Sequence, residues 1–522
     1  MLRSTFLGYK TATSALTVSQ NMMDVVGQNI SNVNTQGYSR QRLDINSVSL
    51  SNSNVKFGTT GAVIGQGVGT SGVSQYRDSF LDLRYRTESA KVGSEEVQLE
   101  ALGDLESIFD EITTDGLDSQ FSDLLEQLHS LTSSPSDPVL EGVVRTSAEM
   151  LTQIFNNYSN QIDTVKDQQL SYLKDGAVEK TNQILGNIAD LNKQIKADNV
   201  SGNPALELND ERNTLIDELS NYLDIKVSTE PLEIGGGKTV DELVIRLGNT
   251  GLELVNRDKN IELVVGENTT NPYETAIYSE TNNDDGTTTQ VDISTLISGG
   301  QIGGYLKFLN GSGEYASTSY ENKGAIYFES MLDTLANKFA NIMNDTNKSV
   351  DGYDKDLFSA RGADATDPST EIITAGNIKI SDNWAKATDS YITNTKTTGV
   401  GDNSGATDNI LKMISKFQSG EGTFDFKTSG DTGTPIFKGT FQEFLTYTST
   451  RLSLQVSDAN TSFDTYSDTQ YQIDYARSSI SSVDLNEEGV NLLTYSKSYN
   501  AAARLMTTLD DMLDTLINEM AR

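Results

Sequence analysis

Residues 492–520, LLTYSKSYNAAARLMTTLDDMLDTLINEM, and residues 2–30, LRSTFLGYKTATSALTVSQNMMDVVGQNI, decide the fold. Each segment carries one apolar stripe whose members recur at alternating steps of three and four. A helix with such a stripe must bury it against a partner helix. One stripe comprises Leu492, Tyr495, Tyr499, Ala502, Met506, Leu509, Leu513, Leu516 and Met520. The other comprises Leu2, Phe6, Tyr9, Thr13, Leu16, Gln20, Met23, Gly27 and Ile30.

The two stripes match layer by layer when the two ends of the chain run antiparallel. This register pairs Leu2 with Met520, Phe6 with Leu516, Tyr9 with Leu513, Leu16 with Met506, Met23 with Tyr499, and Ile30 with Leu492. Weak layers at Thr13, Gln20 and Gly27 predict a pair of marginal stability, which neighbouring subunits would have to cover. The sequence therefore predicts a terminal coiled coil that also serves as the assembly interface of a tube-forming subunit.

Between these ends the sequence changes character near residue 225. Apolar residues at helical spacing precede that point and predict one long helix over residues 140–197, whereas short strand-like runs and turn-forming residues follow it up to residue 310. We predict an α+β, multidomain protein. Its parts are a terminal coiled-coil domain (1–38 plus 480–522), a largely helical bundle domain with some β-structure (39–224 plus 311–479), and an inserted β-rich domain (225–310).

Charge and composition argue against several kinds of partner. The chain has 522 residues and a net charge of −35, which opposes binding to the phosphate backbone of nucleic acid. It contains no cysteine, so disulfides and thiolate catalysis are excluded. No apolar run reaches the length that spans a bilayer, and the N-terminus lacks the apolar stretch of a secretory signal peptide. We expect neither a nucleic-acid partner nor a membrane partner.

Three local patterns could carry chemistry, and each has a simpler structural explanation. The single histidine, His129, lies among leucines at helical spacing and cannot build a zinc site or a Cys–His pair. Residues 67–72, GVGTSG, match the dinucleotide fingerprint in letters but have no βαβ unit around them. Residues 282–286, NNDDG, fit a hairpin turn better than a calcium loop. We predict no catalytic residue, no cofactor and no metal site.

Residues 29–42, NISNVNTQGYSRQR, resemble the N-terminal signature of the bacterial flagellar rod, hook and hook-associated axial proteins. The signature positions are Asn29, Asn32, Asn34, Thr35, Gly37 and Tyr38. Further stretches are similar to the hook-associated proteins of the hook–filament junction, namely residues 483–493, 499–506, 509–517, 208–219, 332–344 and 356–358. The resemblance covers both ends and the helical framework, and the β-rich middle contributes little to it.

This resemblance implies a structural subunit of the bacterial flagellum that joins hook to filament and permits filament assembly. The implied partners are other copies of the chain in a ring, hook protein, hook-associated protein 3 toward flagellin, and an export chaperone at the C-terminal helix. The implied route is type III export, and the implied place is the extracellular hook–filament junction. Two alternatives stay open: another axial component, such as a hook or rod protein, and a filament-associated hydrolase with a zinc peptidase insert.

Overall fold

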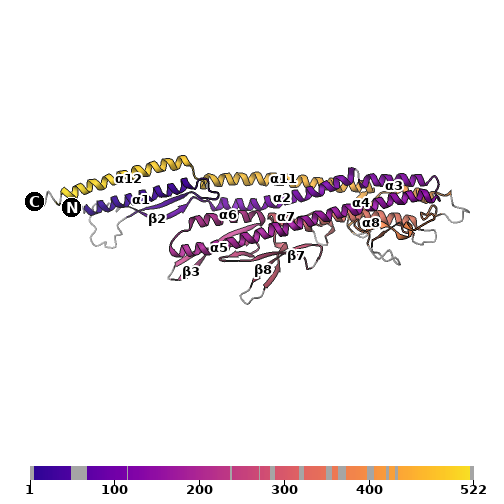
Figure 1. The fold of residues 1–522 in the computed structure, drawn as a ribbon, viewed down its shortest axis with the longest axis horizontal. Coiled ribbons are helices and arrows are strands. Elements are labelled where there is room, and N and C mark those ends of the chain that lie inside the picture. Colours follow the sequence, from indigo (N-terminus) through magenta and orange to yellow (C-terminus); the bar gives the residue numbers. More distant parts are fainter. Residues whose placement is uncertain are drawn as a thin grey trace.

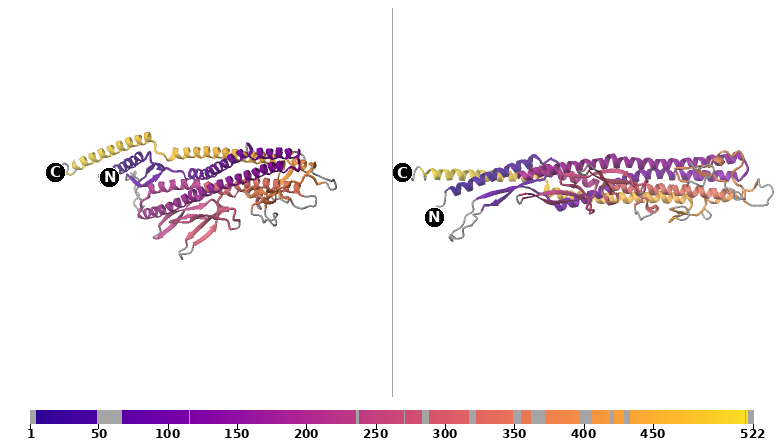
Figure 2. Two further views of the ribbon diagram at one scale, coloured as in Figure 1. Left: turned by 45° about the vertical axis from the view of Figure 1, so that its right-hand side comes forward. Right: turned by 90° about the horizontal axis from the view of Figure 1, so that it is seen from below.

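The computed structural model describes residues 5–48, 67–114, 116–235, 238–269, 271–282, 288–316, 322–348, 355–361, 372–396, 405–418, 422–428, 433–515 and 517. The molecule is an elongated rod, and both chain termini lie at the same end of it (Figure 1). Long helices run along the rod, and the larger β-sheets project from one flank. The two further views show the same elongation (Figure 2). Mixed helices and small sheets confirm the predicted α+β class.

The terminal end of the rod consists of two helices and a two-stranded ribbon. Helix α1 (Thr5–Ser31) lies beside helix α12 (Leu485–Asp514), as Figure 1 shows. Strands β1 (Gln41–Ser47) and β2 (Val68–Gln75) pair antiparallel and pack against α1, with a register shift after Asp44. Residues 67–72, which match the dinucleotide fingerprint in letters, therefore begin a strand of this ribbon and do not open a helix.

The body of the rod is built from helices that run back and forth. In chain order these are α2 (Ser79–Thr114), α3 (Leu117–Leu131), α4 (Pro138–Ser171), the π-helical segment η2 (Tyr172–Val178), α5 (Glu179–Ser201), α6 (Leu206–Tyr222) and, near the C-terminus, α11 (Phe441–Ser481). Helix α11 lies along α2 over much of its length. Segments α4, η2 and α5 follow one another without a break, so the long helix predicted over residues 140–197 is present.

Capping residues explain where two of the helices begin. Asp137 accepts the Val139 N–H at the start of α4, whose first residue is a proline. Asp484 accepts the N–H groups of residues 486 and 487 and so starts α12, with three residues between this helix and the end of α11. These caps satisfy backbone donors that a helix start leaves unpaired. The short break between α11 and α12 lets the chain leave the body and enter the terminal helix pair.

The β-rich segment forms two antiparallel sheets. Strands β3 (Ile225–Gly235), β4 (Lys238–Leu247), β5 (Glu253–Asn256) and β6 (Lys259–Asn260) follow one another in the first sheet, and β7 (Glu262–Glu267), β8 (Thr275–Asn282) and β9 (Thr288–Asp292) form the second. The 3₁₀ turn η3 (Ser294–Leu296) and helix α7 (Gly300–Asn310) return the chain to the rod, where α7 packs on α2.

The end of the rod far from the termini holds the remaining elements. These are η4 (Gly313–Tyr315), α8 (Ala325–Asn347), β10 (Phe358–Ala360), β11 (Ile378–Ile380), α9 (Asp382–Ala385), α10 (Asp408–Ser415), β12 (Phe424–Lys427) and β13 (Pro435–Gly439). The ring of Phe121 on α3 lies 5.3 Å from that of Phe339 on α8 and 5.8 Å from that of Phe441 on α11, measured between centroids. This aromatic cluster ties three helices together, because aromatic pairs at such distances add to their area burial.

One contiguous hydrophobic core runs through the body and into both sheets. Ile188 on α5, Leu254 on β5, Ile277 on β8 and Phe339 on α8 are all buried in it. The β-rich segment thus shares its core with the helices of the rod. The boundaries that we predict for the three domains stay a prediction.

A carboxyl group on α8 has an unusual environment. Burial raises the pKa of Asp333 to about 7, although the Ala375 N–H donates a 2.8 Å hydrogen bond to it. The nearby carboxylates Glu329 and Asp163 raise this pKa further, and the Lys166 ammonium works in the opposite direction. Asp333 therefore takes up a proton on folding near neutral pH.

Replacing Asp333 with asparagine should stabilise the protein at pH 8. The folded state holds the Asp333 proton up to about pH 7, whereas the unfolded state releases it near the ordinary pKa of 3.8, so this carboxyl's contribution to stability falls as pH rises between those values. Asparagine stays neutral and still accepts the Ala375 N–H. We expect Asp333→Asn to raise the free energy of urea unfolding at pH 8 by about 1–3 kcal/mol.

The control for this prediction is Asp167→Asn, which changes an exposed carboxylate on α4 and should bring no such gain. At pH 3.5 the benefit of Asp333→Asn should vanish, because both states of the wild-type protein then hold the proton to a similar degree. A gain of equal size at both pH values would contradict this explanation.

Candidate assembly interface

Helix α12 turns the predicted stripe toward α1. Ala502 is buried, and the other members that are covered by α1 are half-buried: Tyr495, Tyr499, Met506, Leu509 and Leu513. Leu492 lies at the edge, with 39% of its surface exposed. The side chains of Leu516 and Met520 lie outside the described residues. The pattern of burial on α12 follows the predicted spacing over the part of the helix that the structure describes.

On α1 the face that packs inward is offset by one position from the predicted stripe. Ala12, Ser19 and Val26 are buried, whereas Tyr9 is 43% exposed. Leu16, Met23 and Ile30 are half-buried, and Thr13, Gln20 and Gly27 are exposed. The side chains of Leu2 and Phe6 lie outside the described residues. We call the seven positions from Tyr9 to Ile30 the α1 stripe; it lies beside the buried face and does not form it.

The register of the helix pair also differs from the predicted one. A Cβ built on Gly8 would stand 3.3 Å from Leu509 Cδ2, so the Leu509 side chain packs over Gly8. The predicted register sets Leu509 opposite Thr13, a displacement of about one and a half helical turns. The physical reason is size: the large side chains of α12 approach α1 most closely where α1 offers glycine, alanine and serine. The predicted layer pairing is therefore corrected here.

The signature residue Asn29 is a buried bridge between α1 and β1. Its side-chain amide donates to the Gln41 carbonyl at 3.0 Å, and its Oδ1 accepts the Gln41 N–H at 2.9 Å. The Tyr38 hydroxyl donates to the same Oδ1 at 2.9 Å. Asn29 is 1% exposed, so losing these partners would leave buried polar groups unpaired. A pair of bonds to one residue's N–H and C=O fixes β1 relative to α1.

The rest of the signature shapes the turn that follows α1. Gly37 has a φ of +78°, and a Cβ there would lie 2.2 Å from Thr214 Oγ1 on α6. Only glycine combines that backbone conformation with so close an approach. Thr35 donates to Asn32 Oδ1 at 3.2 Å, while Asn34 is exposed. These residues act together as a joint between the terminal helix pair and the body.

Charged side chains complete this joint. Arg40 Nε lies 2.7 Å from an oxygen of Glu488, which is buried at the start of α12, and Arg40 also pairs with Glu487. The Ser39 N–H donates to Asp210 on α6 at 2.9 Å. Burial raises the pKa of Asp210, and the bond from Ser39 opposes that shift. The link from residues 39–40 therefore reaches both α12 and the body.

A second set of ion pairs holds α2, α6 and α11 together just below the joint. Asp217 accepts from Arg86 at 2.7 Å and from Arg477 at 2.5 Å, so one carboxylate connects all three helices. Arg77 pairs with Asp82 at 2.6 Å. Sequence reasoning missed this network. Its only sequence signal is the motif at residues 208–219, which includes Asp217 but does not reveal its partners.

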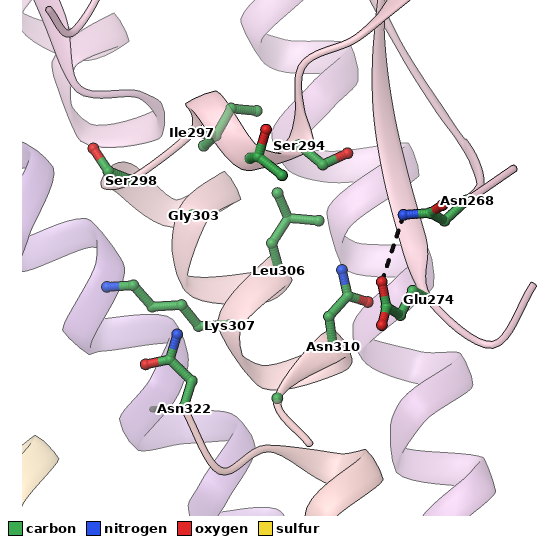
Figure 3. A pocket seen from close by; sticks show the side chains of 12 residues that line it. Asn268, Glu274, Ser294, Ile297, Ser298, Gly303, Leu306, Lys307, Asn310 and Asn322 are labelled. Carbon is green, nitrogen blue, oxygen red and sulfur yellow. Dashed lines mark hydrogen bonds between the residues drawn. The ribbon is translucent and has the colours of Figure 1, made fainter. Parts of the chain in front are cut away.

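A hollow lies between the second sheet and α7, and several of the polar side chains that line it are hydrogen-bonded to neighbouring residues. Its volume is about 370 Å³, and Figure 3 shows the side chains that line it. There Asn310 bonds to both the N–H and C=O of Thr275, Asn268 donates to Glu274, and Lys307 donates to Ser94. The bonds of Asn310 and Lys307 hold α7 to its neighbours.

Two of the sequence patterns that we considered as possible chemical sites, at His129 and at residues 282–286, lie at the surface or largely outside the described residues. His129 is exposed near the end of α3, and the motif residues Asn283 to Gly286 lie outside the described part. Among the described residues no group of three or more His, Cys, Asp or Glu side chains is placed to hold a metal ion. No described helix combines the length and hydropathy needed to cross a membrane.

Comparison with known families finds three matching models. The model of the flagellar hook-associated protein FlgK helical domain matches residues 102–362, which is half of the chain. The C-terminal model of the flagellar basal body rod FlgEFG proteins matches residues 477–519, and the flagella basal body rod protein model matches residues 10–38. The two shorter matches fall on α12 and on α1 with its joint.

Two relatives of known sequence align with this chain over nearly its whole length. The flagellar hook-associated protein 1 of Bacillus subtilis (strain 168) is 28% identical over 541 aligned positions, covering 99% of each chain. Its namesake from Escherichia coli (strain K12) is 23% identical, covering 97% of this chain and 98% of the other. The solved structure of the flagellar hook junction protein FlgK from Burkholderia pseudomallei shares the fold, with a TM-score of 0.56, 13% identity, and coverage of 76% of this chain and 100% of that one.

Removing the Asn29 bridge should loosen the joint locally. Asn29→Leu keeps the volume but leaves the Gln41 N–H and C=O without their partner, which should cost about 1–3 kcal/mol. We expect the amides of β1 to exchange with deuterium roughly 10- to 100-fold faster in mass spectrometry. The matched control is Asn34→Leu, an exposed position in the same turn, which should leave exchange unchanged. Unaltered protection of β1 in Asn29→Leu would refute the bridging role.

Proposed function

The chain belongs to the flagellar hook-associated protein family, whose helical domain spans residues 102–362, and on this premise we propose that it is a structural subunit at the junction between hook and filament. It acts by assembly and catalyses no reaction. The solved structure with the same fold is that of a flagellar hook junction protein, which supports the location. The extent of the helical-domain match favours this role over that of a hook or rod subunit.

One observation carries the proposal: α1 and α12, from opposite ends of the chain, lie side by side at one end of a long rod (Figure 1). A subunit built in this way can insert its helix pair into a shared tube while its body extends outward. The joint at Asn29 and Arg40 supports such a division, because it holds the pair at a fixed place relative to the body.

We propose that this subunit binds several partners. Copies of the chain associate in a ring, with hook protein on one side and hook-associated protein 3, toward flagellin, on the other. An export chaperone holds α12 before assembly, and type III export then delivers the chain to the extracellular junction. Exposed apolar side chains on α12, such as Leu493 and Met512, support the need for a partner at each stage.

Genetic replacement in the bacterium that encodes this chain tests the proposal. Deleting the gene should leave hooks intact, remove filaments, and release flagellin into the medium, and the full chain supplied from a plasmid should restore filaments. A chain lacking residues 1–30 should fail to restore them although its body folds. Its secretion is measured in parallel by immunoblot, and circular dichroism of the purified chain checks the folding of the body.

The outcome that contradicts the proposal is equally concrete. Filaments of normal number on cells without the gene would remove the junction role. Restored filament growth by the chain that lacks residues 1–30 would show that the helix pair is dispensable for assembly.

A further inference from the structure

A hollow of about 430 Å³ lies between helix α6 and the turn that follows α1, where the body meets the terminal helix pair (Figure 1). Residues of the turn at 32–38 line one side of it. Five residues of α6 line the other side: Glu207, Asp210, Glu211, Thr214 and Leu215. We call this space the turn hollow. It is separate from the contact between α1 and α12.

Two carboxylates of α6 face the turn hollow without a cation. Glu207 and Glu211 lie one helical turn apart on the same side of the helix, and like charges at this spacing repel each other. Glu207 accepts a 3.1 Å hydrogen bond from the Gln41 amide, which is a neutral donor, and Glu211 is exposed. Within the described part of the chain, neither carboxylate forms an ion pair with Lys or Arg. A cation bound at both would relieve their repulsion.

Asp210 adds a buried negative charge to the same wall. It is 5% exposed, and its Oδ2 accepts the Ser39 N–H at 2.9 Å and the Gln75 amide at 2.8 Å. Its Oδ1 accepts no hydrogen bond from any described residue. The Arg77 guanidinium approaches this oxygen only to 3.9 Å, because it binds Asp82 at 2.6 Å. Part of the Asp210 charge is therefore left uncompensated, and it acts on the turn hollow through surroundings of low dielectric constant.

Tyr38, on the opposite wall, lies in the same negative potential. Burial raises the pKa of its hydroxyl, and the charges of Glu207, Asp210 and Glu488 raise that pKa further. The hydroxyl donates to Asn29 Oδ1, so the phenol stays neutral and its half-buried ring adds carbon surface to the wall. The turn hollow therefore combines acidic groups with apolar surface.

These features fit the side chain of arginine. Its apolar stem can cover the carbon surface of Leu215 and Tyr38 while its head stays with polar groups. The guanidinium is a planar fork of N–H donors that suits carboxylates, so it can bind Glu207 and Glu211 together, whereas a lysine ammonium is a point charge. A metal ion fits less well, because among the described residues no group of three or more His, Cys, Asp or Glu side chains is placed to hold one.

The charge of the chain favours a different protein as the source of this arginine. The chain carries a net charge of −35, so two copies repel each other, whereas a basic surface on another subunit is attracted. We propose that the turn hollow receives an arginine side chain from a different protein subunit of the flagellum. This inference rests on the proposed function and adds to it a contact outside the helix pair.

Binding of a short peptide to the full chain tests the chemistry of the turn hollow. The probe is a tripeptide with arginine between two glycines and both ends blocked. The comparison peptide carries citrulline, which has a similar shape and no charge. Saturation-transfer NMR at low salt should show the arginine peptide bound about 10-fold more tightly, because hydrogen bonds to charged groups are the stronger ones.

Removing both charges from the wall should weaken that binding. The double variant Glu207→Gln, Glu211→Gln stays neutral there and still offers Gln41 an acceptor, so it should fold, which circular dichroism checks. We expect it to bind the arginine peptide about 10-fold more weakly. The control Asp190→Asn changes an exposed carboxylate of α5 and should bind as the unchanged chain does. Equal binding of the two peptides, or undiminished binding by the double variant, would overturn the inference.

Photochemical cross-linking in assembled particles identifies the source of the arginine. Gln36 lies at the turn hollow and is exposed, and it is replaced by the photoreactive residue benzoylphenylalanine. Isolated hook–filament particles are illuminated and digested, and mass spectrometry identifies the linked segments. We expect an arginine-containing segment from a different flagellar protein. Particles in which no other protein is linked, or in which the linked segment belongs to a second copy of this chain, would overturn the inference.

An arginine supplied by the chain itself should exclude the partner. Glu211→Arg places a cation at the turn hollow, where it would repel an incoming guanidinium, and we expect roughly 10-fold fewer filamented cells. The matched control is Asp190→Arg, which makes the same charge change at an exposed position of α5 and should leave filaments unchanged. Immunoblots of the medium should show both variants secreted.

The cell experiment distinguishes failure of this inference from failure of the proposed function. If the unchanged chain cannot restore filaments to cells without the gene, the proposed function fails. If Glu211→Arg restores filaments as fully as Asp190→Arg does, the function stands and the inference falls. Retention of Glu211→Arg inside the cell, while Asp190→Arg is secreted, would assign the turn hollow to a step of export and would also overturn the inference. Secretion of both variants, with filaments lost only for Glu211→Arg, supports the arginine contact.

Discussion

The packing of α1 against α12 fixes the layout of the whole molecule, because it joins segments that lie at opposite ends of a 522-residue chain. Bringing such distant segments together has an entropic cost that grows slowly with the length of the loop between them. A large folded body between the two helices reduces that cost, since the body already holds the exit of α1 near the entrance of α12. The pair in turn needs the body, because isolated helices of this composition are marginal in water.

The joint holds the pair of α1 and α12 in a fixed position relative to the body. Asn29 ties α1 to β1 through both polar groups of Gln41, and Arg40 ties the same segment to the buried Glu488 of α12. Ser39 reaches Asp210 on α6. Removing one partner from such a buried charged network costs more than losing an exposed ion pair, because the remaining group stays desolvated. The terminal helices therefore behave as a continuation of the rod.

Sequence patterns predicted the terminal pair and the long helices, because their apolar periodicity extends over many turns. The seam of α12 was predicted at the correct face, since its members are large and apolar. On α1 the large residues Tyr9 and Met23 led to the prediction of a stripe beside the buried face. That face contains the smaller residues Gly8, over which Leu509 of α12 packs, and Ala12, which is buried. Spacing cannot choose between two adjacent stripes when the close approach depends on small side chains. The shared core of the sheets and rod was not predictable either, because it depends on contacts between segments far apart in sequence.

Pulsed electron resonance between two spin labels tests the central claim most directly. Lys10→Cys and Thr507→Cys place the labels at exposed positions on α1 and α12, at the level where Leu509 packs over Gly8, in a chain with no other cysteine. Side-by-side helices with axes about 8–10 Å apart predict one narrow distribution of distances, centred at roughly 15–30 Å once the label arms are included. A broad distribution centred well beyond that range would show that the two ends of the chain do not pair.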